Sequence, residues 1–149
     1  MSDIETIKKI RDMTGLSVGQ IKKALEESDG NEAKAIEILK AHGATVAAKK
    51  GSRTTSQGVV ESYVHTNRKI AATVALLCET DFVARNPIFL ELAHEVAMHI
   101  TAMEPKDTDE LLSQPYIKDQ NITVKDLING AIAKLGENIK VGEFSRIQI

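Results

Sequence analysis

The chain has 149 residues, of which 42% are hydrophobic and 27% are charged, and its formal net charge is −2. This length and composition are typical of one soluble globular domain or a small pair of domains. The near-neutral charge argues against a protein that binds mainly through nucleic acid phosphates or anionic lipid headgroups.

Several features of the sequence indicate its cellular location. A single cysteine, Cys78, excludes an internal disulfide and suits a reducing compartment. No run approaches the roughly 20 apolar residues that span a bilayer. Residues 1–5 carry neither the apolar core of a signal peptide nor an Arg-rich presequence. We therefore expect a cytoplasmic protein with no membrane partner.

Residues 1–43 are predicted to form three short amphipathic helices. Each begins at a residue type that caps helix N-termini and ends beside a glycine. The caps are Asp3, Ser17 and Asn31, and the glycines are Gly15, Gly30 and Gly43. Turns of a few residues between such helices predict a compact bundle. Its size and the turn at residues 13–16 resemble a ubiquitin-associated (UBA-like) module.

Residues 44–57 are expected to link this module to the rest of the chain. They are mostly small or polar, and the apolar periodicity fades along them. We interpret the first part as a fraying extension of the third helix and the remainder as linker. This gives a module over 1–43, a linker over 44–57 and a core domain over 58–149.

The core domain is predicted to contain three strands. Residues 58–65 alternate in pattern, residues 69–78 are rich in branched apolar side chains, and the turn between them completes a β-hairpin. Alternation returns over residues 138–149, which supply the third strand.

Two helices lie between the second and third strands in this prediction. Asn86 followed by Pro87 opens a long helix that ends at Met103. A second runs from Thr123 to Leu135, and residues 106–121 are expected to be mostly loop with one helical turn. The side chains expected to face the core from the long helix are Phe89, Leu90, Ala93, Val96, Ala97 and Ile100. The fold class is therefore α+β, with a small antiparallel sheet and helices packed on one face.

The sequence offers no set of residues for covalent or metal chemistry. Lys49-Lys50-Gly51-Ser52 has the wrong order and context for a phosphate-binding loop. His94 and His99 are five positions apart, which rotates them by about 140° on a helix and prevents a shared metal, so we expect both at the helix rim. Cys78 is expected to be a structural thiol. We expect no enzyme activity, no cofactor and no metal site.

Phe82 occupies an unusual position for a large aromatic residue. The segment Thr80-Asp81-Phe82-Val83 lies at the predicted turn between the second strand and the long helix. Such turns favour Asp and Thr as caps but do not favour Phe. The ring is either folded back into the core, which residue statistics alone favour, or presented to a partner.

Ten consecutive residues around this turn, 77–86, resemble the signature of the elongation factor Ts family. Residues 7–15, 21–30 and 131–139 resemble further parts of the same family. The resemblance implies a translation elongation factor that acts as a guanine nucleotide exchange factor. Such a protein binds elongation factor Tu, a GTPase, and promotes GDP release by disturbing its Mg²⁺ and phosphate site. It binds no nucleotide directly.

The resemblance also implies roles for individual residues. Phe82 would enter the GTPase domain of elongation factor Tu, Asp81 would cap the turn, and Thr80 and Val83 would frame the ring. Lys22, on the second helix of the module, matches a family position that contacts the nucleotide-binding domain of the partner. Functionally, this favours a presented Phe82 over a buried one.

The chain departs from the family pattern in two ways that bear on function. Val18 and Gly19 stand where relatives often carry two methionines, and the chain is shorter than many relatives. The family implies that so short a core pairs with a second copy of itself, which suits a sheet with one uncovered face.

An alternative function is a nucleic-acid-binding adaptor. It would use the three-helix module and the basic residues Lys49, Lys50 and Arg53. The near-neutral charge and the lack of interleaved aromatic residues argue against it.

Overall fold

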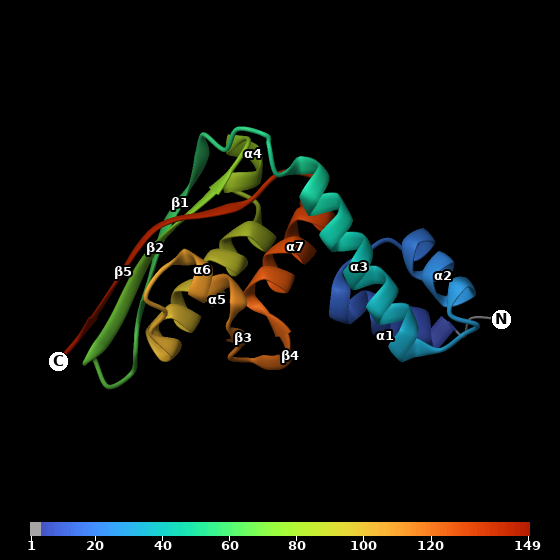
Figure 1. Cartoon of the computed structure of the whole chain (residues 1–149), viewed down its shortest axis with the longest axis horizontal. Helices are drawn as coiled ribbons and strands as arrows, with labels where there is room; N and C mark the ends of the chain where they lie inside the picture. Colours follow the sequence, from blue (N-terminus) through green and yellow to red (C-terminus); the bar gives the residue numbers. More distant parts are fainter. Residues whose placement is uncertain (1–3) are drawn as a thin grey trace.

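The computed structural model describes residues 4–149 and confirms the α+β fold class (Figure 1). Three N-terminal helices precede a three-stranded antiparallel sheet with helices on one face. In chain order the elements are α1 (Ile4–Thr14), α2 (Val18–Glu27), α3 (Glu32–Lys50), β1 (Gln57–Val64), β2 (Ile70–Cys78), α4 (Asp81–Ala84), α5 (Pro87–Met103), α6 (Thr108–Ser113), β3 (Pro115–Tyr116), β4 (Asp119–Thr123), α7 (Val124–Leu135) and β5 (Lys140–Gln148).

Helices α1 to α3 enclose a small core of their own. Ile10, Ile21 and Leu25 are buried at its centre. Ser17 caps α2 through a reciprocal pair of hydrogen bonds with Gln20, and Asn31 caps α3 by accepting a hydrogen bond from the Lys34 N–H. Both caps were predicted. The third predicted cap, Asp3, lies outside the described residues.

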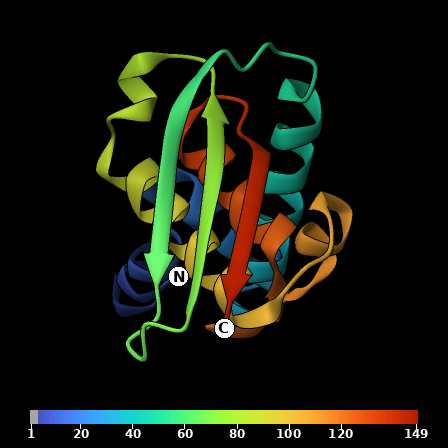
Figure 2. The ribbon, with the colours of Figure 1, turned by 90° about the vertical axis from the view of Figure 1, so that its left-hand side faces the viewer.

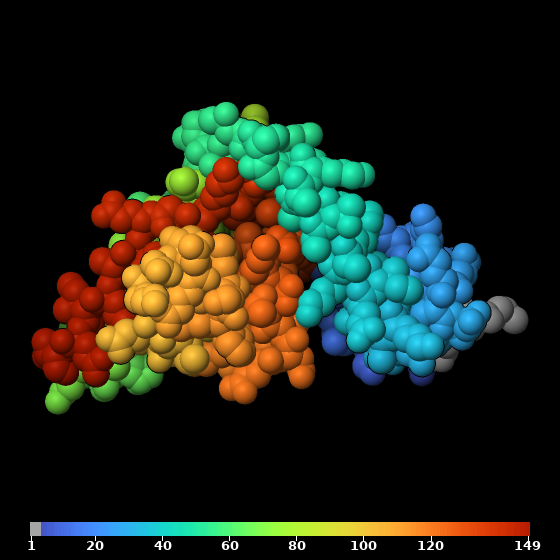
Figure 3. Space-filling view, in the orientation of Figure 1, coloured from blue at the N-terminus to red at the C-terminus, as the bar shows by residue number. Residues whose placement is uncertain are grey.

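The third module helix was predicted to end at Gly43, with a fraying extension beyond it. In the structure, α3 continues as a regular helix to Lys50. The expected helical extension into residues 44–57 is therefore present, and only residues 51–56 separate α3 from β1. The alanine-rich sequence favours the helix, and its far half packs on the core, where Val46 and Ala47 touch buried residues. Figure 3 shows α3 (cyan) lying against α7 (orange) along a continuous surface. The division into module, linker and core domain stays a prediction.

The sheet has the order β1-β2-β5, with all pairs antiparallel. The central strand is β2, and its Val74, Leu76 and Cys78 are fully buried on the face that the helices cover. Figure 2 views the opposite face, with the three strands in front and the helices behind them. The alternating pattern that predicted β1 and β5 reflects this one-sided burial.

Helix α5 packs on the sheet through most of the predicted side chains, with Phe89, Val96 and Ile100 fully buried. Two of the predictions for this helix are wrong. Leu90 is 39% exposed rather than in the core. His99 is fully buried rather than at the rim, because its ring accepts a hydrogen bond from the Ile117 N–H and makes a second with Gln114.

Residues 106–121 are more ordered than the sequence predicted. The expected helical turn is α6, but β3 and β4 form a small hairpin that the sequence did not indicate. The hairpin is anchored on α5, since the Tyr116 hydroxyl donates to Glu95 at 2.6 Å and Lys118 forms an ion pair with the same carboxylate at 2.7 Å. Across residues 4–149, no helix combines the length and apolar character that crossing a bilayer requires.

Candidate partner-binding site

The segment of residues 79–86, here called the Phe82 turn, connects the end of β2 to the start of α5. It contains α4, a helix of a single turn, which lies beside the end of the sheet in Figure 1. A helix this short is not stable alone in water. Its conformation therefore depends on its caps and on contacts with the rest of the domain.

The side chains of α4 divide between the core and the surface. Ala84 is buried, and Val83 is half-buried against the core. Phe82, by contrast, is 81% exposed to solvent. The ring is thus not part of this chain's core. Leaving an aromatic side chain of this size in water forgoes the ~1.5–3 kcal/mol that burying it would contribute.

Thr80, not Asp81, caps the turn. The Thr80 hydroxyl oxygen accepts a hydrogen bond from the Val83 N–H at 3.4 Å. Asp81 instead forms an ion pair with Arg85 at 2.9 Å, one turn along. The predicted capping role of Asp81 is therefore wrong. The guanidinium carbon of Arg85 also lies 5.9 Å from the centre of the Phe82 ring, within reach of a cation–π contact.

A carboxylate from far along the chain holds the start of the turn. Glu137 accepts hydrogen bonds from the Glu79 N–H at 3.1 Å and the Thr80 N–H at 3.0 Å through one oxygen. Its other oxygen accepts from the Thr80 hydroxyl at 2.6 Å. No local pattern in the sequence pointed to Glu137. The pairing of β2 with β5 could have done so, because it aligns Leu77 with Lys140 and brings the residues beyond them together.

The neighbouring residue Asn138 links the turn to the segment that leaves α3. Its backbone N–H donates to the Glu79 carboxylate at 2.9 Å, and its side-chain amide donates to the Arg53 carbonyl at 2.9 Å. Arg53 lies 3.8 Å from the same Glu79 carboxylate. Asn138 is only 2% exposed, so these bonds satisfy a buried amide.

Cys78, at the end of β2, has no feature of a nucleophile. Its thiol donates to the Thr80 carbonyl at 3.2 Å and is buried. Burial raises the pKa of the Cys78 thiol, and the negative charge of Glu137 raises that pKa further. The thiol is thus held in its protonated, unreactive form.

Lys22 lies on a different surface from the Phe82 turn. It is exposed on α2, next to the buried Ile21. Figure 1 places α2 within the N-terminal module and α4 at the end of the sheet, so the two are not neighbours. The four residues 80–83 are therefore brought together in one turn, whereas Lys22 belongs to a separate surface.

The basic residues of the alternative function lie at the end of α3 and just after it. Lys49 and Lys50 occupy the last turn of α3, where positive charge is favourable to the helix dipole. Arg53 faces Glu79, as described above.

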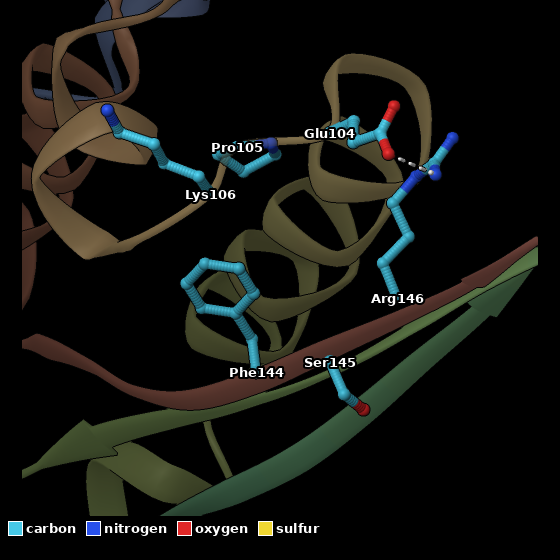
Figure 4. Close-up of a pocket in the computed structure, with 6 residues that line it drawn as sticks. All are labelled: Glu104, Pro105, Lys106, Phe144, Ser145 and Arg146. Atoms are coloured by element: carbon cyan, nitrogen blue, oxygen red, sulfur yellow. Dashed lines mark ion pairs between the residues drawn. The ribbon is translucent and has the colours of Figure 1, made fainter.

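A hollow between the end of α5 and β5 contains the arginine drawn in Figure 4. Arg146 donates to the Thr101 carbonyl at 3.0 Å and lies 3.4 Å from the Glu104 carboxylate. Its guanidinium group thus binds a carbonyl oxygen in the last turn of α5, where such groups lack partners within the helix. Within residues 4–149, no three His, Cys, Asp or Glu side chains gather closely enough to hold a metal ion.

Comparison with known proteins identifies the family. The sequence model described as "Elongation factor TS" matches residues 79–149, which begin at the Phe82 turn. Elongation factor Ts of Oleidesulfovibrio alaskensis is 39% identical over 188 aligned positions, covering 96% of this chain and 95% of the relative. The chain belongs to the elongation factor Ts family. It is accordingly a translation elongation factor, with a role in protein biosynthesis.

Two further members of the elongation factor Ts family show how lengths vary. The protein of Thermotoga maritima is 39% identical over 189 positions, covering 98% of this chain and 95% of the relative. That of Clostridium novyi is 39% identical over 149 positions, covering all of this chain but 49% of the relative. The alignments with the Oleidesulfovibrio alaskensis and Thermotoga maritima proteins are longer than the 149 residues of this chain. Those two relatives therefore carry segments that this chain lacks.

Proposed function

We propose that this chain is a guanine nucleotide exchange factor that binds elongation factor Tu and promotes GDP release by disturbing its Mg²⁺ and phosphate site. The observation that carries the proposal is the Phe82 ring, 81% exposed on a short helix that packs on the core through Ala84 and the half-buried Val83. A ring displayed in this way can be inserted into a partner without disturbing the domain that carries it. The chain then acts by binding alone, with no covalent step, no cofactor and no nucleotide of its own.

Magnitudes indicate that Phe82 does not act alone. An acceleration of GDP release by ~10³ requires about 4 kcal/mol of differential binding. Burying one Phe side chain contributes ~1.5–3 kcal/mol. A second contact must supply the difference, and the exposed Lys22 on α2 is the residue we assign to it. The ion pair between Lys40 and Asp126 and the packing of α3 on α7 give the module a defined position from which to do so.

The effect on nucleotide binding is reciprocal. If this chain weakens the affinity of elongation factor Tu for GDP by a given factor, GDP weakens the affinity for this chain by the same factor. The chain therefore supplies no free energy to the exchange. Nucleotide concentrations and relative affinities decide which nucleotide refills the partner.

We also propose that the core domain forms a homodimer through the uncovered face of the sheet. The strand register puts Val64, Ala71 and Ile147 in one row across that face. Val60, Val64 and Ile147 are 73%, 59% and 69% exposed. An apolar sheet face of this kind is stabilised by packing on a second layer, and a second copy of the same face is the partner that the family implies.

The exchange proposal is tested by following fluorescent GDP as it leaves elongation factor Tu in a stopped-flow instrument. Addition of this chain at micromolar concentration is expected to accelerate release by orders of magnitude. Acceleration should saturate as the ternary complex fills. An unchanged release rate across that concentration range would refute the proposal.

A further inference from the structure

We infer that Glu137 is a positioning residue for Phe82. It sets the direction of the exposed ring by fixing the two residues that precede α4. The inference rests on the function proposed above and adds to it a residue outside the Phe82 turn.

The geometry assigns this role to one carboxylate. Three donors converge on it, namely the N–H groups of Glu79 and Thr80 and the hydroxyl of Thr80, at 3.1, 3.0 and 2.6 Å. Hydrogen bonds to an ionised carboxylate are about twice as strong as neutral ones. Together the three bonds fix the backbone of Glu79 and Thr80 and the side-chain rotamer of Thr80.

The fixed rotamer of Thr80 is what determines the start of α4. The same hydroxyl that donates to Glu137 accepts the hydrogen bond of the Val83 N–H that caps the helix. A hydroxyl can donate one hydrogen bond, and that of Thr80 donates to Glu137. A lone pair of the hydroxyl oxygen therefore remains to accept the Val83 N–H. Glu137 thereby orients the cap, and the cap sets the first turn of a helix whose second residue is Phe82.

Glu137 itself is well anchored. It follows Gly136, which ends α7 in a left-handed conformation, and it precedes Asn138, whose bonds hold both Glu79 and Arg53. The turn is thus attached to α7 and β5 rather than only to its own flanking residues. Without Glu137, the turn keeps the bond from Asn138 to Glu79 and the packing of Ala84, but the N–H groups of Glu79 and Thr80 and the Thr80 hydroxyl lose their acceptor.

The test compares Glu137→Ala with Phe82→Ala and with the double variant in the stopped-flow GDP release assay. We expect Glu137→Ala to lower the saturating release rate on the order of tenfold, within the ~10²-fold that a misplacement of about 1 Å can cost. Because Glu137 acts through Phe82, the double variant should be no slower than Phe82→Ala alone. Asp109→Ala, which removes an exposed carboxylate from α6, away from both the Phe82 turn and the uncovered sheet face, is the control and should keep the wild-type rate.

Glu137→Gln provides a rescue that a merely structural role would not predict. Its remaining oxygen can accept from both backbone N–H groups, and its amide can donate to the Thr80 hydroxyl. Its rate should lie between those of the wild type and Glu137→Ala. Amide hydrogen exchange at Glu79 and Thr80 in the free chain should follow the same order, fastest in Glu137→Ala. If Glu137→Ala is unfolded at the assay temperature, the release rates of Glu137→Gln and Thr80→Val are compared with those of the wild type and Phe82→Ala instead.

Three outcomes would overturn the inference. The first is a wild-type rate in Glu137→Ala. The second is a double variant slowed, relative to Phe82→Ala, by the full factor of Glu137→Ala. The third is a Phe82→Ala variant as fast as the wild type. In all three the exchange function itself survives, whereas a wild-type chain that fails to accelerate release would refute that function and this inference with it.

Discussion

Lys40 of α3 and Asp126 of α7 form an ion pair of 3.1 Å that joins the N-terminal helices to the helices that cover the sheet. The same carboxylate also accepts the Thr123 N–H at 2.9 Å, which completes the capping box of α7. The Asp126 side chain therefore both caps the start of α7 and binds Lys40 of α3. Asp126 is partly buried, which makes this pair stronger than one between fully exposed charges.

Replacing Asp126 by Ala is expected to destabilise the chain by about 1–2 kcal/mol, since it removes a helix-capping bond and the ion pair between α3 and α7. The loss should lower the melting temperature by a few degrees, as followed by circular dichroism. Glu32→Ala removes a comparable but more exposed ion pair, with Lys9, and should change stability by less than about 0.5 kcal/mol. Equal losses in the two variants would contradict the structural role of Asp126.

The Asp126 contribution should depend on pH at the acidic end. Burial alone would raise the pKa of Asp126, but hydrogen bonds from Thr123 and Lys40 outweigh it and lower the pKa below its usual value. A group with a lowered pKa in the folded state stabilises the fold above its unfolded pKa of about 3.9 and loses this contribution as pH falls through its folded pKa. The stability difference between wild type and Asp126→Ala, from urea unfolding at several pH values, should shrink as pH falls below about 4.

His99 should make stability depend on pH near neutrality. Its Nδ1 accepts the Ile117 N–H, so Nε2 carries the proton and donates to Gln114, and the ring stacks on Tyr116. Burial lowers the pKa of His99, although the bond to Gln114 opposes this shift. Because the unfolded chain binds this proton more readily, stability should fall as pH drops below about 6.5 towards the lowered pKa.

His99→Asn should weaken this dependence, and the exposed His94→Asn should leave it unchanged. Urea unfolding between pH 5 and 8 measures both. The Asn variant will be less stable at every pH because a ring is lost from a buried site. The informative quantity is therefore the slope of stability against pH, and a slope equal to that of wild type would show that another group titrates.

Elements whose pattern follows from local burial could be predicted from the sequence. The strands and the long helix alternate or repeat with the period of their buried face, and Asn31, Ser17 and Asn86 cap helices as predicted. A helical extension of α3 past Gly43 was expected, but its ordered end at Lys50 could not be predicted, because Val46 and Ala47 in its last turns pack on the distant core. The β3–β4 hairpin was missed for the same reason, since its stabilising contacts lie on α5.

The candidate site shows the same limit at the level of single residues. The position of Phe82 at a turn was evident from the sequence, but its exposure was not, because residue statistics favour burial. The caps of a one-turn helix also could not be assigned, since Thr80 and Asp81 both suit the position. Glu137 is separated from Thr80 by 57 residues, and only the pairing of β2 with β5 brings them together.

The uncovered sheet face gives a prediction about the oligomeric state. Val60→Lys combined with Ile147→Lys places two charges on each copy of the proposed interface and should convert the dimer to a monomer. Light scattering at several concentrations measures this change. Ile4→Lys, at an exposed apolar position of the module, is the control and should leave the mass unchanged. A wild-type chain that is monomeric at high concentration would refute the proposed dimer.

Phe82→Ala separates a presented ring from a structural one. Because the side chain is 81% exposed, its loss should change stability by no more than about 0.5 kcal/mol, so the melting temperature should stay within about 2 °C of wild type. The saturating rate of GDP release from elongation factor Tu should nevertheless fall by on the order of tenfold or more, since ~1.5–3 kcal/mol of binding is lost. Phe89→Ala, which empties a buried site on α5, should instead cost about 3–5 kcal/mol of stability. If Phe82→Ala melted like Phe89→Ala, the ring would be holding its own domain together and could not be the group presented to the GTPase.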